Sequence, residues 1–273
     1  MISTIAMATD GSKAAVSAER YAVSLASRLK ARLSGLSVVE ERFVRGIEED
    51  GLGVVPPNLD GLGAYLSNRA TATARRLGER AAAENVDHYC DTAEGIADDR
   101  IVERGQQADL IVIGRDGNYA SFHSGLIGST ANGVIRKTSK PALVVPSGAE
   151  QSGPIVLAFD GSPGSRIGAN LAVQLATRLG EQIHVFVDSK DKGRAAARFE
   201  EVRELVGSTP VPVREISSTL GRPDVKIVDS AREVRAGLIV MGAYGRNRIT
   251  EYFLGSNASA VVRTSPIAVL LAR

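Results

Sequence analysis

The sequence is poor in several features that would mark particular classes of protein. Its 273 residues include one cysteine, Cys90, which excludes an internal disulfide and favours a reducing compartment. Tryptophan is missing, aromatic residues make up 4% and the formal net charge is +2, which argues against a nucleic-acid partner. The N-terminus lacks the basic start of a signal peptide, and no apolar run approaches the ~20 residues of a membrane helix. We therefore expect a cytoplasmic protein that neither enters nor binds a membrane.

Two common nucleotide-binding signatures are also missing. There is no Gly-x4-Gly-Lys-Ser/Thr motif, and no Gly-x-Gly-x-x-Gly motif follows a strand-like run, which excludes a P-loop NTPase and argues against a dinucleotide enzyme. The three histidines are scattered, with no metal-ligand spacing. No general base is evident, so we assign no catalytic residue.

The main positive feature is an internal repeat. The turn Asp10-Gly11-Ser12 recurs 150 positions later as Asp160-Gly161-Ser162, and a glycine pattern beginning at Gly114 recurs from Gly242. A repeat of this length is a duplicated domain, and about two domains are expected for a chain of this size. A polar linker rich in glycine and proline separates the copies. We predict domains at residues 1–147 and 153–273.

Short apolar runs alternate with amphipathic segments in both halves, which predicts parallel sheets covered by helices on both faces. Strands are expected at residues 4–9, 33–39, 86–90, 110–113, 142–145, 155–159, 183–187, 211–216, 238–241 and 267–271. Helices are expected at residues 12–29, 65–84, 96–106, 129–137, 165–179, 194–206, 225–234 and 257–264. An irregular stretch at 41–62 interrupts the first half. Each half should be a doubly wound α/β domain with five strands and a ligand crevice beyond the strands' carboxyl ends.

The glycine pattern lies at such a strand end in both copies. Glycine leaves room for close approach of a phosphate, and a following helix offers free N–H groups and the positive end of its dipole. The pattern Gly242-x2-Gly245-x9-Gly255-Ser256, together with the Asp-Gly-Ser turn, resembles the ATP-binding branch of the universal stress protein family. Nearly the whole chain is similar to a tandem member of it. The resemblance implies a fold like that of adenine nucleotide alpha hydrolases, a bound ATP or related adenine nucleotide, and dimerisation through the last strand.

The resemblance also implies roles for residues of the second copy. Asp160 would face the nucleoside, backbone near Val187 would hold the adenine edge, and glycines with a helix start would bind phosphate. The expected nucleotide contacts of this copy are Phe159, Asp160, Val187, Met241, Gly242, Tyr244, Gly245, Arg246, Gly255, Ser256 and Asn257.

The first copy departs from the family pattern. One more residue separates Gly117 from Gly128, and Asp116 stands where the second copy has Tyr244. A carboxylate beside phosphates calls for an intervening Mg²⁺, so Asp116 is a candidate magnesium contact. The alternative is a degenerate copy retained for pairing. The candidate nucleotide contacts here are Thr9, Asp10, Val39, Ile113, Gly114, Gly117, Gly128, Ser129 and Thr130.

Three functions remain open. The first is an ATP-binding regulatory protein of the stress response with little or no turnover, acting as a homodimer and on an unidentified protein partner. The second is a slow ATPase, although no residue is suited to position water for phosphoryl transfer. The third is a nucleotide-free scaffold that acts by dimerisation.

Overall fold

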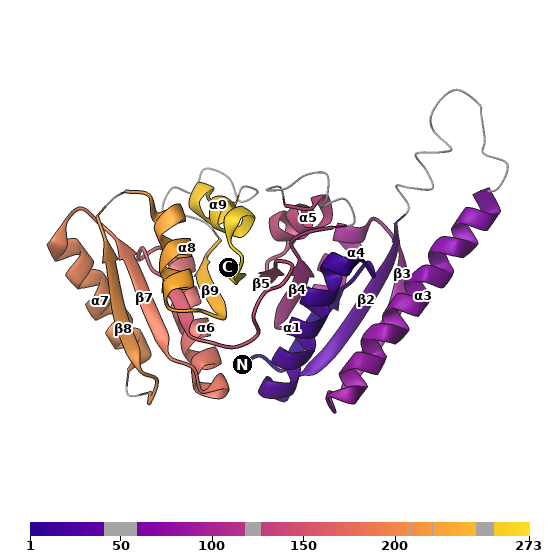
Figure 1. The fold of residues 1–273 in the computed structure, drawn as a ribbon, viewed down its shortest axis with the longest axis horizontal. Helices are drawn as coiled ribbons and strands as arrows, with labels where there is room; N and C mark the ends of the chain where they lie inside the picture. Colours follow the sequence, from indigo (N-terminus) through magenta and orange to yellow (C-terminus); the bar gives the residue numbers. More distant parts are fainter. Residues whose placement is uncertain (41–58, 118–126, 208, 220, 244–253) are drawn as a thin grey trace, which may run out of the picture.

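The structure, a computed structural model, describes residues 1–40, 59–117, 127–207, 209–219, 221–243 and 254–273 (Figure 1). Its strands are β1 (Thr4–Ala8), β2 (Arg32–Glu40), β3 (His88–Gly95), β4 (Leu110–Gly114), β5 (Ala142–Val145), β6 (Ile155–Ala158), β7 (Ile183–Asp188), β8 (Val213–Ser218), β9 (Leu238–Gly242) and β10 (Ala268–Ala272). Its helices are α1 (Lys13–Leu29), α3 (Leu59–Ala83), α4 (Ala97–Gln106), α5 (Ser129–Lys137), α6 (Pro163–Leu179), α7 (Lys192–Val206), α8 (Pro223–Glu233) and α9 (Ser256–Thr264).

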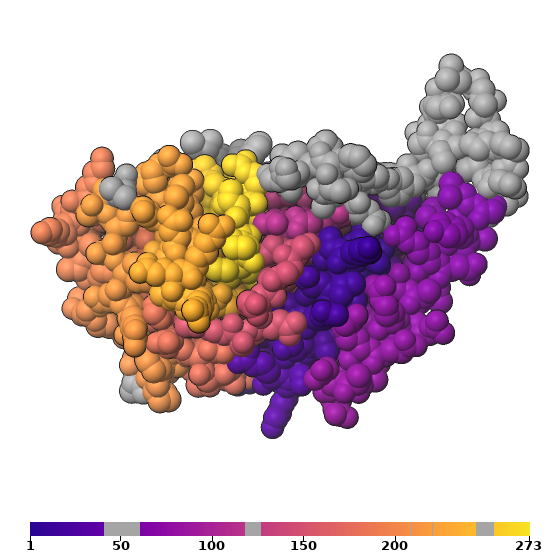
Figure 2. Space-filling view, viewed as in Figure 1, coloured from indigo at the N-terminus to yellow at the C-terminus, as the bar shows by residue number. Residues whose placement is uncertain are grey.

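The strands form one sheet in the order β3-β2-β1-β4-β5-β10-β9-β6-β7-β8. Within each half every neighbouring pair is parallel, which confirms two doubly wound units of five strands. The halves join where β5 and β10 pair antiparallel, with Val144 opposite Val269. The last strand of each half would be an exposed edge of its own sheet, and here it pairs with the last strand of the other half. Figure 2 shows the C-terminal residues at the middle of the molecule.

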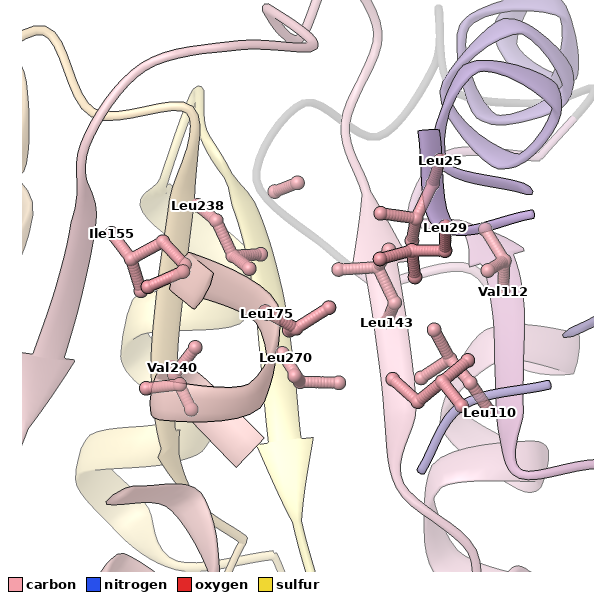
Figure 3. Close-up of a cluster of buried hydrophobic side chains, with 14 of the residues drawn as sticks. Leu25, Leu29, Leu110, Val112, Leu143, Ile155, Leu175, Leu238, Val240 and Leu270 are labelled. Atoms are coloured by element: carbon pink, nitrogen blue, oxygen red, sulfur yellow. The ribbon is translucent and has the colours of Figure 1, made fainter. Parts of the chain in front are cut away.

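Two apolar layers cover the sheet, one on each face. Helices α1, α3, α6 and α7 pack on one face in a continuous cluster that crosses the junction of the halves. There Leu143 of β5 and Leu270 of β10 lie between the α1 and α6 leucines (Figure 3). Helices α4, α5, α8 and α9 cover the other face. Whether a buried residue near a strand end packs in the first or the second of these layers therefore shows on which face of the sheet its side chain lies.

Polar contacts reinforce the junction at its margins. The buried Tyr21 hydroxyl donates to the Gly237 carbonyl oxygen at 2.9 Å, and burial raises the pKa of that phenol above its ordinary range. Arg28 donates to the Leu179 carbonyl oxygen and forms an ion pair with Glu181, both at 2.9 Å. The two halves therefore share a core and a set of hydrogen bonds.

The expected elements all occur, with three corrections of extent. The strand expected at 211–216 was placed two residues too early, because β8 runs from Val213 to Ser218. The irregular stretch was placed too far along the chain, because α3 already begins at Leu59; residues 41–58 lie outside the described part. The third strand was placed too early, because β3 runs from His88 to Gly95. That strand is at an edge of the sheet and carries polar residues, so no apolar run marks it. No helix in the described ranges is long and apolar enough to cross a membrane.

Candidate functional site

The Asp-Gly-Ser turn connects the first strand of each half to its helix, with the same geometry in both. In the second half Asp160 Oδ1 accepts a hydrogen bond from the Ser162 backbone N–H at 2.9 Å. Ser162 in turn caps α6 by accepting from the Ser165 N–H. Gly161 has φ +74, a left-handed conformation that favours glycine. The turn fixes Asp160 directly beyond the carboxyl end of β6.

A cavity of about 610 Å³ opens beside this turn, at the carboxyl ends of β6, β7 and β9. Helices α8 and α9 supply its other wall. Its lining consists of Ala158, Phe159, Asp160, Ser162, Phe186, Asp188, Ser189, Lys190, Asp191, Arg194, Pro223, Ile227, Met241, Gly242, Gly255, Ser256, Asn257 and Ala258. A crevice at this edge is where doubly wound sheets bind ligands.

The start of α9 forms one end of the cavity. Gly255 is its N-cap and offers no side-chain hydrogen bond to the first turn, whose residues Ser256, Asn257 and Ala258 all line the cavity. A helix of nine residues presents its positive dipole end there, and no side chain of the described residues caps its first N–H groups. This end of the cavity is suited to an anion such as phosphate.

Gly242 brings the end of β9 close to α6. A Cβ built on Gly242 would lie 2.9 Å from the Gly164 carbonyl carbon and from the Ser165 backbone nitrogen. Backbone atoms cannot yield as a flexible side chain can, so the strand reaches this position because the residue has no side chain. The glycine therefore has a packing reason in addition to its place in the cavity wall.

Seven of the eleven residues expected in the second copy line this cavity: Phe159, Asp160, Met241, Gly242, Gly255, Ser256 and Asn257. Val187 packs in the core under α6 and α7, on the other face of the sheet, while its neighbours Phe186 and Asp188 line the cavity. Tyr244, Gly245 and Arg246 lie outside the described residues.

Sequence reasoning expected a contact from β7 at Val187 but missed the charged residues at the end of this strand and at the start of α7. Asp188 ends β7, and Lys190 and Arg194 follow within the next six residues, so the cavity also has charged groups at its end away from α9. The rule that parallel strands end at one edge points to Asp188, because it directly follows the apolar run of a predicted strand. No comparable signal exists for Lys190 and Arg194, which only the path of the chain brings here.

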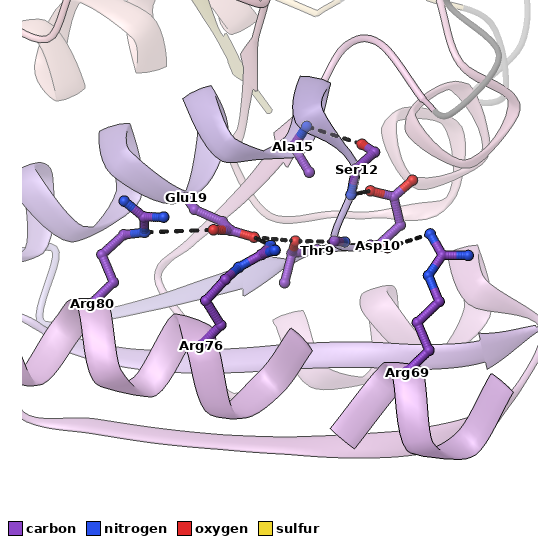
Figure 4. Close-up of polar contacts among 9 residues, drawn as sticks. Thr9, Asp10, Ser12, Ala15, Glu19, Arg69, Arg76 and Arg80 are labelled. Carbon is purple, nitrogen blue, oxygen red and sulfur yellow. Dashed lines mark hydrogen bonds and ion pairs between the residues drawn. The ribbon is translucent and has the colours of Figure 1, made fainter. Parts of the chain in front are cut away.

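In the first half, the corresponding turn is held by a buried polar cluster (Figure 4). The Thr9 hydroxyl donates to Glu19 Oε1 at 2.6 Å, and Arg76 Nη2 donates to the same oxygen at 2.6 Å. Arg80 lies 3.5 Å from the other carboxylate oxygen, and the Glu19 side chain is 0% exposed. Arg69 Nη2 donates to the carbonyl oxygen of Asp10 at 3.1 Å. Thus the arginines of α3 and Glu19 fill the space around Thr9 and Asp10.

The glycines of the first half also converge. The Gly128 N–H donates to the Arg115 carbonyl oxygen at 2.9 Å, and a Cβ on Gly128 would lie 3.5 Å from the Gly117 nitrogen. Ser129 and Thr130 open α5, and Ile113 and Gly114 end β4. Val39 lies in β2, one position before its last residue. The candidate residues of this copy are therefore near strand ends, but α3 side chains share the space.

Asp116 is bound within the protein. Its two carboxylate oxygens accept from the Arg115 guanidinium at 2.8 and 3.1 Å, and one also accepts from the Ser147 N–H. These contacts hold the pKa of Asp116 below its ordinary value, against the effect of partial burial, which raises it. Arg115 also donates to the Ser265 carbonyl oxygen of the second half at 2.7 Å. Arg115 thus connects the two halves, and its ion pair with Asp116 leaves that carboxylate less open to Mg²⁺ than the sequence suggested.

Metal ligation has no other support in the described part of the chain. No group of three or more histidine, cysteine, aspartate or glutamate side chains is placed there to hold an ion. Cys90 is half-buried in β3, and burial raises the pKa of its thiol.

Comparison with known proteins agrees with this architecture. The pattern of the universal stress protein family matches residues 1–146 and again residues 152–273. A universal stress protein of Synechocystis, Slr1230, is 27% identical over 297 aligned residues, which cover 98% of this chain and 99% of that protein. Rv2005c of Mycobacterium tuberculosis, also named a universal stress protein, is 28% identical over 63% of this chain and 64% of its own length.

A solved structure has the same fold over the full length. The crystal structure of a universal stress protein from Archaeoglobus fulgidus superposes with a TM-score of 0.78 at 19% identity, and it covers 99% of this chain and 98% of the other. At this identity the likeness concerns the fold. Since the family pattern matches both halves and together spans nearly every residue, this chain belongs to the universal stress protein family.

Proposed function

We propose that the second half binds an adenine nucleotide, with ATP as the expected ligand, and that the protein acts as a stress-response regulator with little or no turnover. One observation carries the proposal. The cavity at the ends of β6, β7 and β9 has the start of α9, which has no side-chain cap among the described residues, at one end, and apolar side chains flanked by carboxylates and by Lys190 and Arg194 at the other. Its form is that expected for a molecule with an anionic end and an apolar, hydrogen-bonding end.

Three neighbouring regions of the cavity match the phosphates, the ribose and the base of a nucleotide. Phosphates fit at Gly242, Gly255 and Ser256, where N–H groups and the helix dipole favour negative charge. The ribose fits over β6, where Asp160 accepts hydrogen bonds from hydroxyl groups. The base fits against Phe186 and the apolar residues of α8. Strand order β9-β6-β7 therefore follows the order phosphate, ribose, base.

A charge placed at the start of α9 tests this arrangement. In Ser256→Asp the carboxylate occupies the first turn of the helix, where it interacts favourably with the dipole and repels phosphate. We expect calorimetric titration to show ATP affinity at least about tenfold weaker, a loss of about 1.4 kcal/mol, in a protein that unfolds no more easily.

Ser129→Asp is the matched control. It makes the same change at the first residue of α5, a helix of the same length whose glycine N-cap has nearly the same backbone angles, φ −54 and ψ 144 against −55 and 144. We expect it to leave binding by the second half unchanged. Equal ATP affinity in wild type and Ser256→Asp would refute the proposal.

The two alternatives make different predictions for the same proteins. A slow ATPase would release phosphate steadily from ATP, and Ser256→Asp would abolish that release. Under our proposal, wild-type protein releases phosphate no faster than the background hydrolysis of ATP. A nucleotide-free scaffold binds no ATP in either protein. The antiparallel β5–β10 junction already pairs the last strands within one chain, so these strands are not open for pairing with a second chain.

Association of two chains belongs to the same proposal. With β5 and β10 paired internally, the edges of the sheet are β3 and β8. Exposed sheet edges are sites at which proteins pair or cover their backbone. We expect a homodimer, for which light scattering would give twice the mass of the 28.7 kDa chain; a single-chain mass at all concentrations would contradict it.

A further inference from the structure

One residue of the cavity wall has a carboxylate oxygen without a hydrogen-bond donor among the described residues. Asp188 lines the cavity, but its Oδ1 is buried from solvent and accepts no hydrogen bond from the part of the chain that the structure describes. A buried acceptor without a donor is costly, and more so when it carries charge. The χ2 torsion of aspartate is soft, so the carboxylate can turn this oxygen toward the cavity, where a bound molecule would supply the missing N–H or O–H group.

The register of the sheet places this oxygen beyond β7. Ala158 of β6 pairs with Met241 of β9 and with Phe186 of β7, so Asp160 and Asp188 both lie two residues past these paired positions. Neighbouring strands are about 4.8 Å apart, so Asp188 lies one strand further from Gly242 than Asp160 does. Asp160 thus faces the middle of a bound nucleotide, and Asp188 faces the end away from the phosphates.

The surroundings of Asp188 suit a purine base. Side chains alternate along a strand, so Asp188 shares a face with Phe186, which packs in the core beneath α8 and α9. Ile227 of α8 belongs to the same core, and Pro223 opens that helix; both line the cavity. These apolar side chains can hold a flat aromatic ring, and the Asp188 carboxylate can read one polar group on it, although Lys190, Asp191 and Arg194 also line the cavity.

The two halves differ at this position. In the first half Leu36 takes the place of Phe186 in the register, so Val38 stands where the second half has Asp188. The strand therefore forms equally well with valine, and the shared fold does not require a carboxylate here. The carboxylate at position 188 is therefore a feature of the binding site of the second half and is not required for folding of the strand.

We propose that Asp188 selects the base of the nucleotide, because its buried oxygen accepts a hydrogen bond from the exocyclic 6-amino group of adenine. The inference rests on the proposed function. Inosine carries an oxygen at that position, which would set acceptor against acceptor and leave the carboxylate without a donor. A site built around a hydrogen bond discriminates strongly against an analogue that lacks the partner group.

Titration with ATP and ITP tests the assignment. We expect wild-type protein to bind ATP about tenfold or more tightly than ITP, as a hydrogen bond to a buried charge implies. In Asp188→Asn the side chain keeps its shape and offers both a donor and an acceptor, so the ratio should fall to within about threefold. Asp188→Val, which copies Val38, should weaken ATP binding and also lose the preference.

Asp229→Asn is the control, because it removes the same charge from an exposed position on α8 that does not line the cavity. It should keep the wild-type ratio. An ATP-to-ITP ratio that is the same in Asp188→Asn and wild type would overturn the inference while leaving the proposed function intact. Failure of wild-type protein to bind either nucleotide would instead refute the proposed function.

Two further ligands identify other roles for the carboxylate. If GTP binds wild type more tightly than ATP and Asp188→Asn loses that binding, the carboxylate reads the N1–H and 2-amino edge of guanine. If the substitution changes the ratio of ATP to dATP instead of ATP to ITP, the carboxylate reads the ribose. Either result would overturn the assignment to adenine.

Discussion

Substitution of alanine at Gly242 should destabilise the protein, whereas the equivalent change at Gly114 should not. A Cβ at Gly242 would lie 2.9 Å from backbone atoms of Gly164 and Ser165 in the first turn of α6, closer than non-bonded carbon atoms approach. The strand or the helix must therefore shift. Overpacking of this kind costs about 1–3 kcal/mol, against a gain of about 0.4–1 kcal/mol from the stiffer unfolded chain.

Gly114 has the same place in the first half but more room. The nearest atom to its Cβ would be the Asp116 carbonyl oxygen at 3.6 Å, followed by Ala15 Cα at 3.8 Å, which are ordinary contacts. Gly114→Ala should therefore stabilise by about 0.4–1 kcal/mol, while Gly242→Ala loses about 1–2 kcal/mol. Urea unfolding followed by circular dichroism would compare the two. Equal effects, or a more stable Gly242→Ala, would refute the packing argument.

Three other substitutions test separate parts of the structure. Val144→Lys puts a charge into the buried junction opposite Val269, so circular dichroism should show a lower melting temperature; an unaltered one would contradict the β5–β10 pairing. Glu19→Ala removes a fully buried carboxylate from its arginines and should cost about 3 kcal/mol in urea unfolding, with no loss arguing against the cluster. Burial, and to a smaller extent the nearby charge of Arg214, lowers the pKa of His184 below 6.5. The neutral imidazole therefore contributes stability that is fully present above pH 6.5, and this stability is lost as the pH falls through the lowered pKa. His184→Leu should therefore lose less stability than wild type between pH 7 and 5, and an equal loss would contradict the assignment.

Much of the fold follows from local pattern. Continuous apolar runs such as residues 110–113 and 238–241 are typical of strands buried on both faces, and each was predicted within a residue of its observed end. The edge strand β3 was misplaced because only its first residues are apolar or aromatic, and Asp91 and Glu94 carry no such signal. An edge strand has fewer neighbours to satisfy, so its sequence is less constrained.

The candidate site was predictable where a motif repeats. The Asp-Gly-Ser turn and the glycine before α9 stand out because each occurs twice at matching places. Arg194 and Ile227 carry no pattern, since their contribution depends on where α7 and α8 begin relative to the sheet. The contact between Arg115 and the end of α9 could not be predicted, because it spans 150 residues and joins the two copies.

Nucleotide binding by the second half can be measured directly by native mass spectrometry of the full chain mixed with ATP. The arrangement of Gly242, Gly255 and Ser256 predicts an adduct of ATP on wild-type protein and on Ser129→Asp, with loss of the adduct at that site in Ser256→Asp. Nucleotide released on denaturation of freshly purified protein should likewise be an adenine nucleotide. A wild-type chain that takes up no ATP, or a Ser256→Asp chain that retains as much as wild type, would contradict the assignment of this cavity.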